Sequence, residues 1–201
     1  MRRFVVIGRT ATASPDFLLR DLPGTSGRLD VLLRCLRAAL LVSHGIRKDT
    51  LVYLVLLGGP DSPRSLRIDG AATRYVRPDE YSLATTVKKA LSVPIEASGF
   101  VLARTGIWVA RGGLEVVLAD LPPIASYVLD VDGADIRGAS LDARENVFFL
   151  GDHLGLDADA RSRIDGFGAR AIGLGPISVH ADDAIALVSN ELDRRTADTT
   201  S

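Results

Sequence analysis

The stretch from Asn146 to Asn190 places the strongest constraint on what this chain can fold into. It holds two short apolar runs, Val147–Leu150 and Ala171–Leu174, and a glycine follows each of them. Apolar runs of this length are typical of strands that are buried on both faces. Residues 157–167 lie between the runs and can form a helix. Two buried strands joined through a helix predict a parallel crossover unit.

The carboxyl ends of these strands form the first candidate site. In open α/β sheets, ligands bind outside the carboxyl ends of the strands. Three predicted strands end in glycine-containing turns, at Asp132-Gly133, at Gly151-Asp152 and at Gly173-Leu174-Gly175-Pro176. Glycine lets a ligand approach the backbone, whose N–H and C=O groups can bind the edge of an adenine. Ordinary turn chemistry explains the same glycines, so the residues alone leave this site a hypothesis.

The remaining chain alternates predicted strands and helices. Apolar residues at helical spacing predict a helix that begins at Leu29 and ends near Gly45. Ser65–Asp69 and Ala72–Val76 flank a glycine and predict one antiparallel hairpin. Further strands are predicted at 4–7, 51–57, 100–103, 107–110 and 127–131, and further helices at 78–91, 114–121 and 181–194. This order indicates the α/β class, with a mostly parallel sheet.

Length and composition set the domain organisation. The chain has 201 residues, 47% of them hydrophobic, which suits one α/β domain over residues 1–195 and a disordered tail at 196–201. Cys35 is the only cysteine, which excludes an intrachain disulfide and a Cys-based zinc site and fits a reducing cytoplasm. The apolar runs are too short for a signal peptide or a membrane span. We therefore expect a soluble, cytoplasmic protein with no membrane partner.

Several familiar signatures are absent from the sequence. No Gly-x-Gly-x-x-Gly follows the first strand, and there is neither a P-loop nor a Gly-x-Ser-x-Gly elbow. These absences count against nicotinamide-dependent Rossmann enzymes, P-loop NTPases and α/β hydrolases. The three histidines, His44, His153 and His180, lack the spacing of metal ligands, and we expect no metal.

Charge is unevenly distributed along the chain. The net charge of −1 gives no argument for nucleic acid, but arginines crowd the first half and acidic residues the second. Such asymmetry can indicate a phosphate-binding face. A general bias toward arginine explains it equally well.

Several blocks spread from Phe4 to Asp193 together resemble one family. They are Asp-Leu-Pro-Gly-x-x-Gly-Arg-Leu-Asp from Asp21, Leu-Val-Ser-His-Gly-Ile-Arg from Leu41, Arg-Pro-Asp-Glu from Arg77, Phe-Leu-Gly-Asp-His from Phe149, Gly-Leu-Gly-Pro from Gly173 and Asn-Glu-Leu-Asp from Asn190. The chain resembles the TrmY family, SPOUT-class tRNA (pseudouridine54-N1)-methyltransferases with related bacterial proteins. The resemblance implies a SPOUT-like α/β knot with a C-terminal trefoil knot, a homodimer and S-adenosyl-L-methionine as the methyl donor.

The resemblance also implies a cofactor pocket made by backbone and apolar groups. Leu129 should lie against the adenosine, and Gly151 should allow a close backbone approach. The other implied cofactor-binding residues are Leu174, Gly175, Pro176, Ile177, Ser178, Val179 and Ala184. Two positions depart from the family pattern. Ala184 stands where the family often has cysteine, and Tyr81 follows Asp79-Glu80 in place of an arginine-like residue.

The chemistry of the implied reaction points to two further residues. N1 of pseudouridine is an imide-like N–H that must lose its proton before or during attack. Asp152 and His153 lie closest in sequence to the implied pocket and are the candidate catalytic residues. Positioning and electrostatic stabilisation of the anionic ring could replace a dedicated base.

The basic first half supplies the candidates for RNA binding. Arg28, Arg34, Arg37 and Arg47 are predicted to contact tRNA, because arginine binds phosphate with a fork of donors. Arg28 and Arg34 could instead serve the dimer interface together with Asp30.

From the family resemblance we predict N1-methylation of pseudouridine 54 in the T-loop of tRNA. The alternatives are a pseudouridine methyltransferase acting on ribosomal or another RNA, and a non-catalytic RNA-binding dimer.

Overall fold

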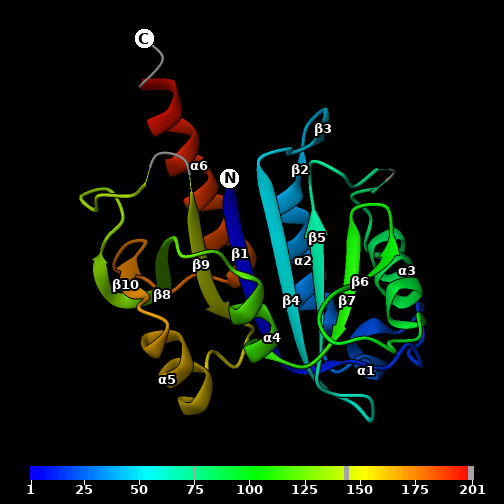
Figure 1. Cartoon of the computed structure of the whole chain (residues 1–201). Helices are drawn as coiled ribbons and strands as arrows, with labels where there is room; N and C mark the ends of the chain where they lie inside the picture. Colours follow the sequence, from blue (N-terminus) through cyan, green and yellow to red (C-terminus); the bar gives the residue numbers. More distant parts are fainter. Residues whose placement is uncertain (75, 143–144, 199–201) are drawn as a thin grey trace.

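A twisted eight-stranded sheet, in the order β10-β8-β9-β1-β4-β5-β7-β6, forms the centre of the molecule (Figure 1). The computed structural model describes residues 1–74, 76–142 and 145–198. The strands of this sheet are β1 Arg2–Thr12, β4 Thr50–Gly58, β5 Arg64–Asp69, β6 Val101–Arg104, β7 Ile107–Arg111, β8 Ala125–Asp135, β9 Asn146–Gly151 and β10 Arg170–Gly173. Two short strands, β2 Leu41–Val42 and β3 Gly45–Ile46, pair separately.

The sheet has a parallel part and an antiparallel part. From β10 to β4 every neighbouring pair is parallel. The pairs β4–β5, β5–β7 and β7–β6 are antiparallel. This arrangement confirms the expected α/β class with a mostly parallel sheet. The predicted crossover from β9 to β10 exists, but β8 lies between these two strands.

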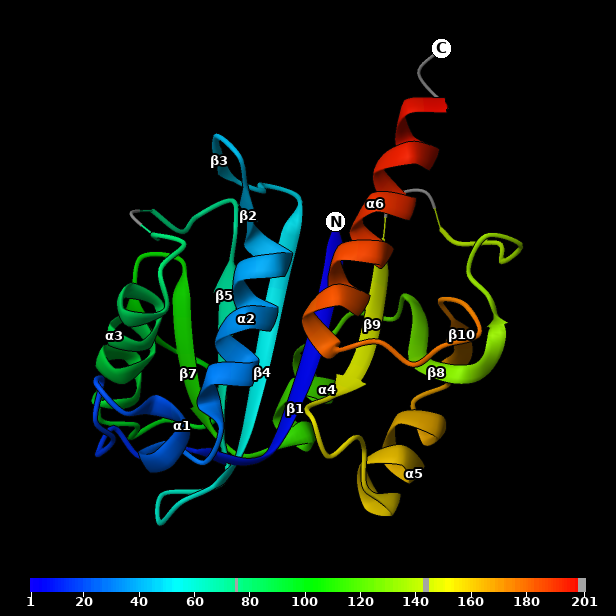
Figure 2. The same ribbon diagram turned by 180° about the vertical axis from the view of Figure 1, so that it is seen from behind.

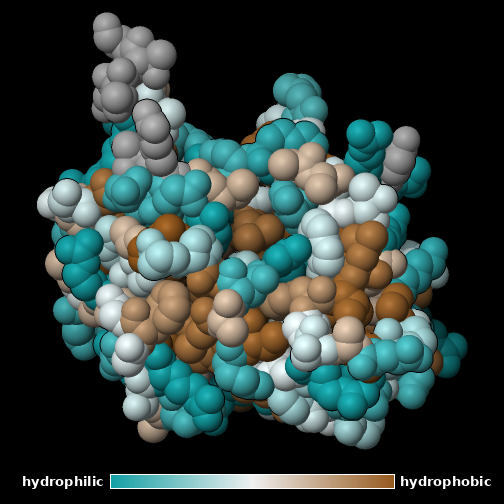
Figure 3. Space-filling view, in the orientation of Figure 1, coloured by the Kyte–Doolittle hydropathy of each residue, from teal (hydrophilic) through white to brown (hydrophobic). Residues whose placement is uncertain are grey.

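Helices cover both faces of the sheet. They are α1 Leu22–Thr25, α2 Leu29–Leu40, α3 Glu80–Leu91, α4 Leu114–Asp120, α5 Ala158–Gly166 and α6 Ala181–Asp198. The core on one face includes side chains of α2, α3 and α6, and the core on the other face includes those of α4 and α5 (Figures 1 and 2). Over β6 and β7, on the side of α4, Figure 3 shows apolar surface. Leu102 of β6 is 61% exposed.

Helix α2 is shorter than the sequence predicted. It ends at Leu40, because Leu41 is already extended and pairs with Ile46 in the β2–β3 hairpin. Its apolar stripe is confirmed, with Leu29, Leu32, Leu33, Leu36 and Leu40 all buried. The hairpin, and not a glycine cap at Gly45, therefore terminates the helix.

The predicted hairpin around Gly70 is wrong in its second arm. Residues 72–74 and 76 are not strand, and Tyr75 lies outside the described residues. The first arm is β5, but it pairs with β4 on one side and β7 on the other. Both edges of β5 are therefore already hydrogen-bonded, which leaves no edge for residues 72–76.

Helix α6 runs four residues beyond the expected end at residue 194. The Arg195 guanidinium donates to the carbonyl oxygens of Ile136 at 2.6 Å and Ala139 at 2.8 Å, which anchors the last turns. Residues 196–198 therefore belong to the helix rather than to the predicted tail. Residues 199–201 lie outside the described part of the chain.

An ion cluster fastens α6 to the start of β1. Arg2, only 6% exposed, donates to the carboxylates of Asp49 at 2.7 Å and Asp193 at 2.8 Å. Arg47 donates to the same oxygen of Asp193 at 2.8 Å. Burial raises the pKa of Asp193, but the hydrogen bonds from Arg47 and Arg2 outweigh it and hold that pKa below its usual value. The cluster fixes where α6 lies on the sheet.

The cluster should make stability depend on acid. A carboxyl group with a lowered pKa in the folded state stabilises above its unfolded pKa of about 4, and this stability is lost as the pH falls through the folded pKa. We expect Asp193→Asn to cost about 1 kcal/mol at pH 7, a value reduced for solvent screening, and to flatten the loss below pH 4. Urea unfolding at several pH values measures both effects. Asp159→Asn, at an exposed pair on α5, is the control, and identical acid profiles for wild type and Asp193→Asn would contradict the prediction.

Within the described residues, no helix combines the length and the apolar character that crossing a membrane requires.

Candidate functional site

The carboxyl ends of β8, β9 and β10 create an opening at one edge of the sheet. Strand β8 pairs with β10 through Tyr127 and Val128, and then again through Ala134 and Asp135. Residues 129–133 lie between these two paired stretches. At Gly133 an added Cβ would lie 2.5 Å from the backbone nitrogen of Ile172, so only glycine permits this approach of the two strands. The irregular segment 129–133 forms one wall of a cavity.

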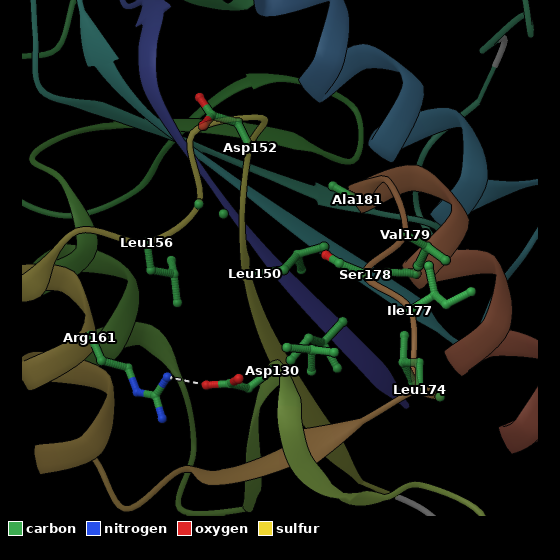
Figure 4. A pocket seen from close by; sticks show the side chains of 16 residues that line it. Asp130, Leu150, Asp152, Leu156, Arg161, Leu174, Ile177, Ser178, Val179 and Ala181 are labelled. Atoms are coloured by element: carbon green, nitrogen blue, oxygen red, sulfur yellow. Dashed lines mark hydrogen bonds and ion pairs between the residues drawn. The ribbon is translucent and has the colours of Figure 1, made fainter.

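This first cavity has a volume of about 370 Å³ and lies between the ends of β8 and β9 and the loop that leads to α6 (Figure 4). Eight of the nine residues that the family resemblance implied for the cofactor line it: Leu129, Gly151, Leu174, Gly175, Ile177, Ser178, Val179 and Ala184. Pro176 lies in the same loop and is exposed, and it is not among the lining residues.

Apolar side chains and one ion pair both line the first cavity. Leu150, Leu156 and Ile177 project into it (Figure 4). The Asp130 carboxylate accepts a hydrogen bond of 2.6 Å from Arg161, and this bond lowers the pKa of Asp130. Sequence reasoning missed both partners. Asp130 adjoins Leu129 at a predicted strand end and was within reach, whereas nothing in the sequence singled out Arg161 on α5.

Two glycines of the cavity have different structural roles. Gly175 has a φ of +136°, and no atom lies within 4 Å of the position that a Cβ would take, so the loop is open at that point. At Gly151 an added Cβ would lie 2.3 Å from the carbonyl carbon of Gly155. The close approach that the structure shows at Gly151 is to the backbone of Gly155, across the turn 151–155. The approach of a cofactor to Gly151 stays a prediction.

Asp152 holds this turn in place. Its carboxylate, with 1% of the side chain exposed, accepts hydrogen bonds of 2.9 Å from the backbone N–H groups of Arg9 and Leu154. Figure 4 shows the carboxylate turned away from the apolar side chains of the cavity. His153 is exposed, and its Nδ1 lies 3.8 Å from Asp152 Oδ2. Asp152 thus joins the end of β9 to the end of β1.

A second cavity of about 770 Å³ adjoins the first. The two share five lining residues, which are Asp152, Gly155, Ser178, Val179 and Ala181. His153, Arg28 and Arg34 line the second cavity only. Two ligands that occupied the two cavities would therefore meet at a common wall.

The four predicted RNA-binding arginines separate into two groups. Arg28 and Arg34 line the second cavity, and Arg37 is exposed on α2 one turn after Arg34. Arg47 lies beyond the opposite end of α2, where its guanidinium is bound to Asp193. The structure thus brings Arg28 and Arg34 to the candidate site but not Arg47.

A match over nearly the whole sequence shows which family the chain belongs to. A family model described as "Putative SAM-dependent RNA methyltransferase" matches residues 1–197. The chain belongs to this family of SAM-dependent RNA methyltransferases. This finding confirms the resemblance that the sequence blocks indicated.

Relatives of the methyltransferase span almost its full length. A Methanosarcina acetivorans protein named tRNA (pseudouridine(54)-N(1))-methyltransferase is 41% identical over 198 residues, which are 98% of this chain and 93% of that protein. A Halobacterium salinarum protein of the same name is 43% identical, covering 96% of each chain. The crystal structure of Archaeoglobus fulgidus Nep1 bound to S-adenosylhomocysteine aligns with a TM-score of 0.64 over 98% of this chain and 99% of that one. At 14% identity, this likeness shows the fold alone.

Within the described residues of the methyltransferase, no group of three His, Cys, Asp or Glu side chains is arranged to hold a metal ion.

Proposed function

We propose that this chain is an S-adenosylmethionine-dependent enzyme that methylates N1 of pseudouridine at position 54, in the T-loop of tRNA. The observation that carries the proposal is the pair of adjoining cavities at the carboxyl ends of β8, β9 and β10. Such a pair can hold a methyl donor and an acceptor base against each other. The two relatives at 41% and 43% identity, whose names state this activity, support the same substrate.

The residues of the first cavity fit the cofactor. Its volume of about 370 Å³ lies in the range of about 300–1,000 Å³ that is typical of small-molecule sites. Apolar walls at Leu129, Leu150 and Ile177 suit an adenosine, and the Asp130 carboxylate can accept hydrogen bonds from sugar hydroxyls. The open backbone at Gly175 lets the loop lie against the ligand. When bound, S-adenosylmethionine supplies a methyl group on a positively charged sulfur.

We assign different roles to the two candidate catalytic residues. Asp152 positions the turn 151–155 through its two backbone hydrogen bonds. His153 is exposed in the second cavity and can take a proton from a bound base. Arg28, Arg34 and Arg37 are the proposed RNA contacts, whereas Arg47 serves the ion cluster with Asp193.

We further propose that residues 1–195 act as one knotted domain, as a homodimer in the cytoplasm. The segment from β10 to α6 crosses the face of β8 and β9 (Figure 2). The Ile136 N–H donates to the Gly173 carbonyl at 2.9 Å, and Arg195 is bound to the same connection after β8. Such close contacts between the connection from β8 to β9 and the chain around β10 support a threaded path. A crystal structure of the protein with its cofactor tests both the path and the dimer.

Methyl transfer to defined tRNAs tests the proposed reaction. We expect the purified protein to methylate a tRNA with pseudouridine at position 54 and not the same tRNA with uridine there, because uridine has no N–H at the corresponding ring position. Mass spectrometry of nucleosides reads the product. Methylation of ribosomal RNA but not of this tRNA would contradict the tRNA assignment, and cofactor binding without transfer to any RNA would favour a non-catalytic protein.

A further inference from the structure

Arg28 has a backbone conformation that favours glycine. Its φ of 68° makes it the one non-glycine residue with positive φ in the described part of the chain. An L side chain in this left-handed region costs about 1 kcal/mol. A long side chain kept at such a position indicates that the side chain itself is needed there.

A buried carboxylate fixes the Arg28 guanidinium. Asp30 is 3% exposed and accepts hydrogen bonds from Arg28 Nε at 3.0 Å and Nη2 at 3.2 Å. It also accepts one of 3.0 Å from Arg34 Nη1. Burial raises the pKa of Asp30, but the two arginines outweigh it and hold that pKa below its usual value. Asp30 thus remains charged and orients both guanidiniums.

The two guanidiniums are held toward the second cavity, not buried in the core. The side chains of Arg28 and Arg34 are 42% and 45% exposed, and both line that cavity. The side-on contact of Arg28 with Asp30 uses Nε and Nη2. It does not use Nη1, which can donate to a ligand.

The second cavity offers hydrogen-bond acceptors as well as donors. Asp152, Asp182 and Asp183 line it together with the two arginines. A pseudouridine ring has two N–H groups and two carbonyl oxygens, and it can therefore use acceptors and donors at once. The wall shared with the first cavity would bring this ring next to the methyl donor.

We propose that the second cavity receives the uracil ring of the target nucleotide and that Arg28 stabilises the ring anion through a carbonyl oxygen. This inference rests on the proposed function and adds the group that makes N1 reactive. N1 gives its proton to His153, the acceptor assigned above, and the electron pair of the N–H bond spreads over the ring and its carbonyl oxygens. A guanidinium beside those oxygens stabilises that charge. Asp30 is the positioning residue for Arg28.

Arg28→Gly is the decisive variant, because it removes the side chain while suiting the backbone. Glycine adopts a φ of 68° without strain, so the variant should keep its fold. We expect kcat to fall by about 10²-fold near pH 7, the usual cost of removing one donor to a developing anion. The control is Arg163→Ala, which removes an exposed guanidinium on α5 and should keep wild-type kcat. Alanine is used there because glycine would weaken the helix.

The pH dependence separates this role from a merely structural one. Without Arg28 the bound ring ionises only at higher pH, so the loss in kcat should shrink as the pH is raised. A structural defect would lower kcat by the same factor at every pH. A constant factor across the pH range, or wild-type kcat in Arg28→Gly, would overturn the inference.

Binding provides a readout that does not require turnover. With S-adenosylhomocysteine present, we expect wild-type affinity for a stem-loop with pseudouridine to rise with pH more than affinity for the uridine stem-loop does. Arg28→Gly should lose this difference. If the wild type transfers no methyl group, the proposed function fails. The binding result is separate: loss of the pH difference in Arg28→Gly supports the inference about Arg28. A pH difference that persists in Arg28→Gly contradicts this inference.

Asp30→Asn tests the positioning role. Asparagine keeps an acceptor oxygen but removes the charge that holds both guanidiniums, and we expect a smaller loss of kcat with the same pH signature. Asp159→Asn, at the exposed pair with Arg163, is the matched control and should change neither. An unchanged pH profile in Asp30→Asn would show that Arg28 does not depend on it.

Discussion

Replacing Asp152 by alanine is expected to destabilise the protein by about 3 kcal/mol and to abolish cofactor binding. The carboxylate is buried and accepts the backbone N–H groups of Arg9 and Leu154. Its loss leaves two partly buried backbone donors without their acceptor, and an unpaired buried donor costs about 1–3 kcal/mol. The turn 151–155 contributes to both cavities, so both should lose their shape. Urea unfolding and calorimetry with S-adenosylmethionine measure the two effects.

The outcome distinguishes a positioning residue from a general base. A general base at Asp152 would leave stability and cofactor affinity close to those of the wild type and would lower kcat alone. His153→Ala is the comparison, because His153 is exposed beside the same turn. We expect this variant to keep stability and cofactor affinity. Wild-type cofactor affinity in Asp152→Ala would contradict the positioning role.

The second large effect is expected for Gly133→Ala. The added methyl group would lie within 2.5–2.7 Å of three backbone atoms of Ile172, and backbone atoms cannot move away as a flexible side chain can. Overpacking of this kind costs about 3 kcal/mol. Strands β8 and β10 would separate where the wall 129–133 ends, so cofactor affinity should fall together with the melting temperature.

Gly138→Ala, in the connection that follows β8, is the matched control. A Cβ at Gly138 would meet only the Asp135 carbonyl oxygen, at 3.8 Å, which is an ordinary contact. We expect this variant to unfold at nearly the wild-type temperature and to bind the cofactor normally. Equal losses in the two variants would show that the β8–β10 approach is not the cause.

The sequence was most informative where one local pattern determined the element. Apolar runs bounded by glycine predicted β9 and β10, and the helical stripe of α2 was predicted residue by residue. Failures arose where pairing with another segment decided the outcome. Pairing with β4 and β7 used both edges of β5, and the β2–β3 hairpin, which directly follows α2, ended that helix before Gly45. An apolar pattern does not show which segments pair.

The site shows the same division. Eight lining residues of the first cavity followed from the family resemblance, and five of these eight lie in the loop 174–179. The roles of individual side chains did not follow. Asp152 adjoins the pocket in sequence, yet its carboxylate is used by backbone amides, and Arg47 belongs to an ion cluster with a residue of α6. Hydrogen-bond partners so distant in sequence are visible only in the fold.

The wall that the two cavities have in common links them thermodynamically. A ligand that orders the turn at Asp152 and the loop at Ser178 and Val179 on one side prepares the same atoms for a ligand on the other. Reciprocity then requires two equal factors: the factor by which the bound donor raises the affinity for the acceptor, and the factor by which the bound acceptor raises the affinity for the donor. Product release obeys the same relation, so the departure of either product lowers the affinity of the protein for the product that remains.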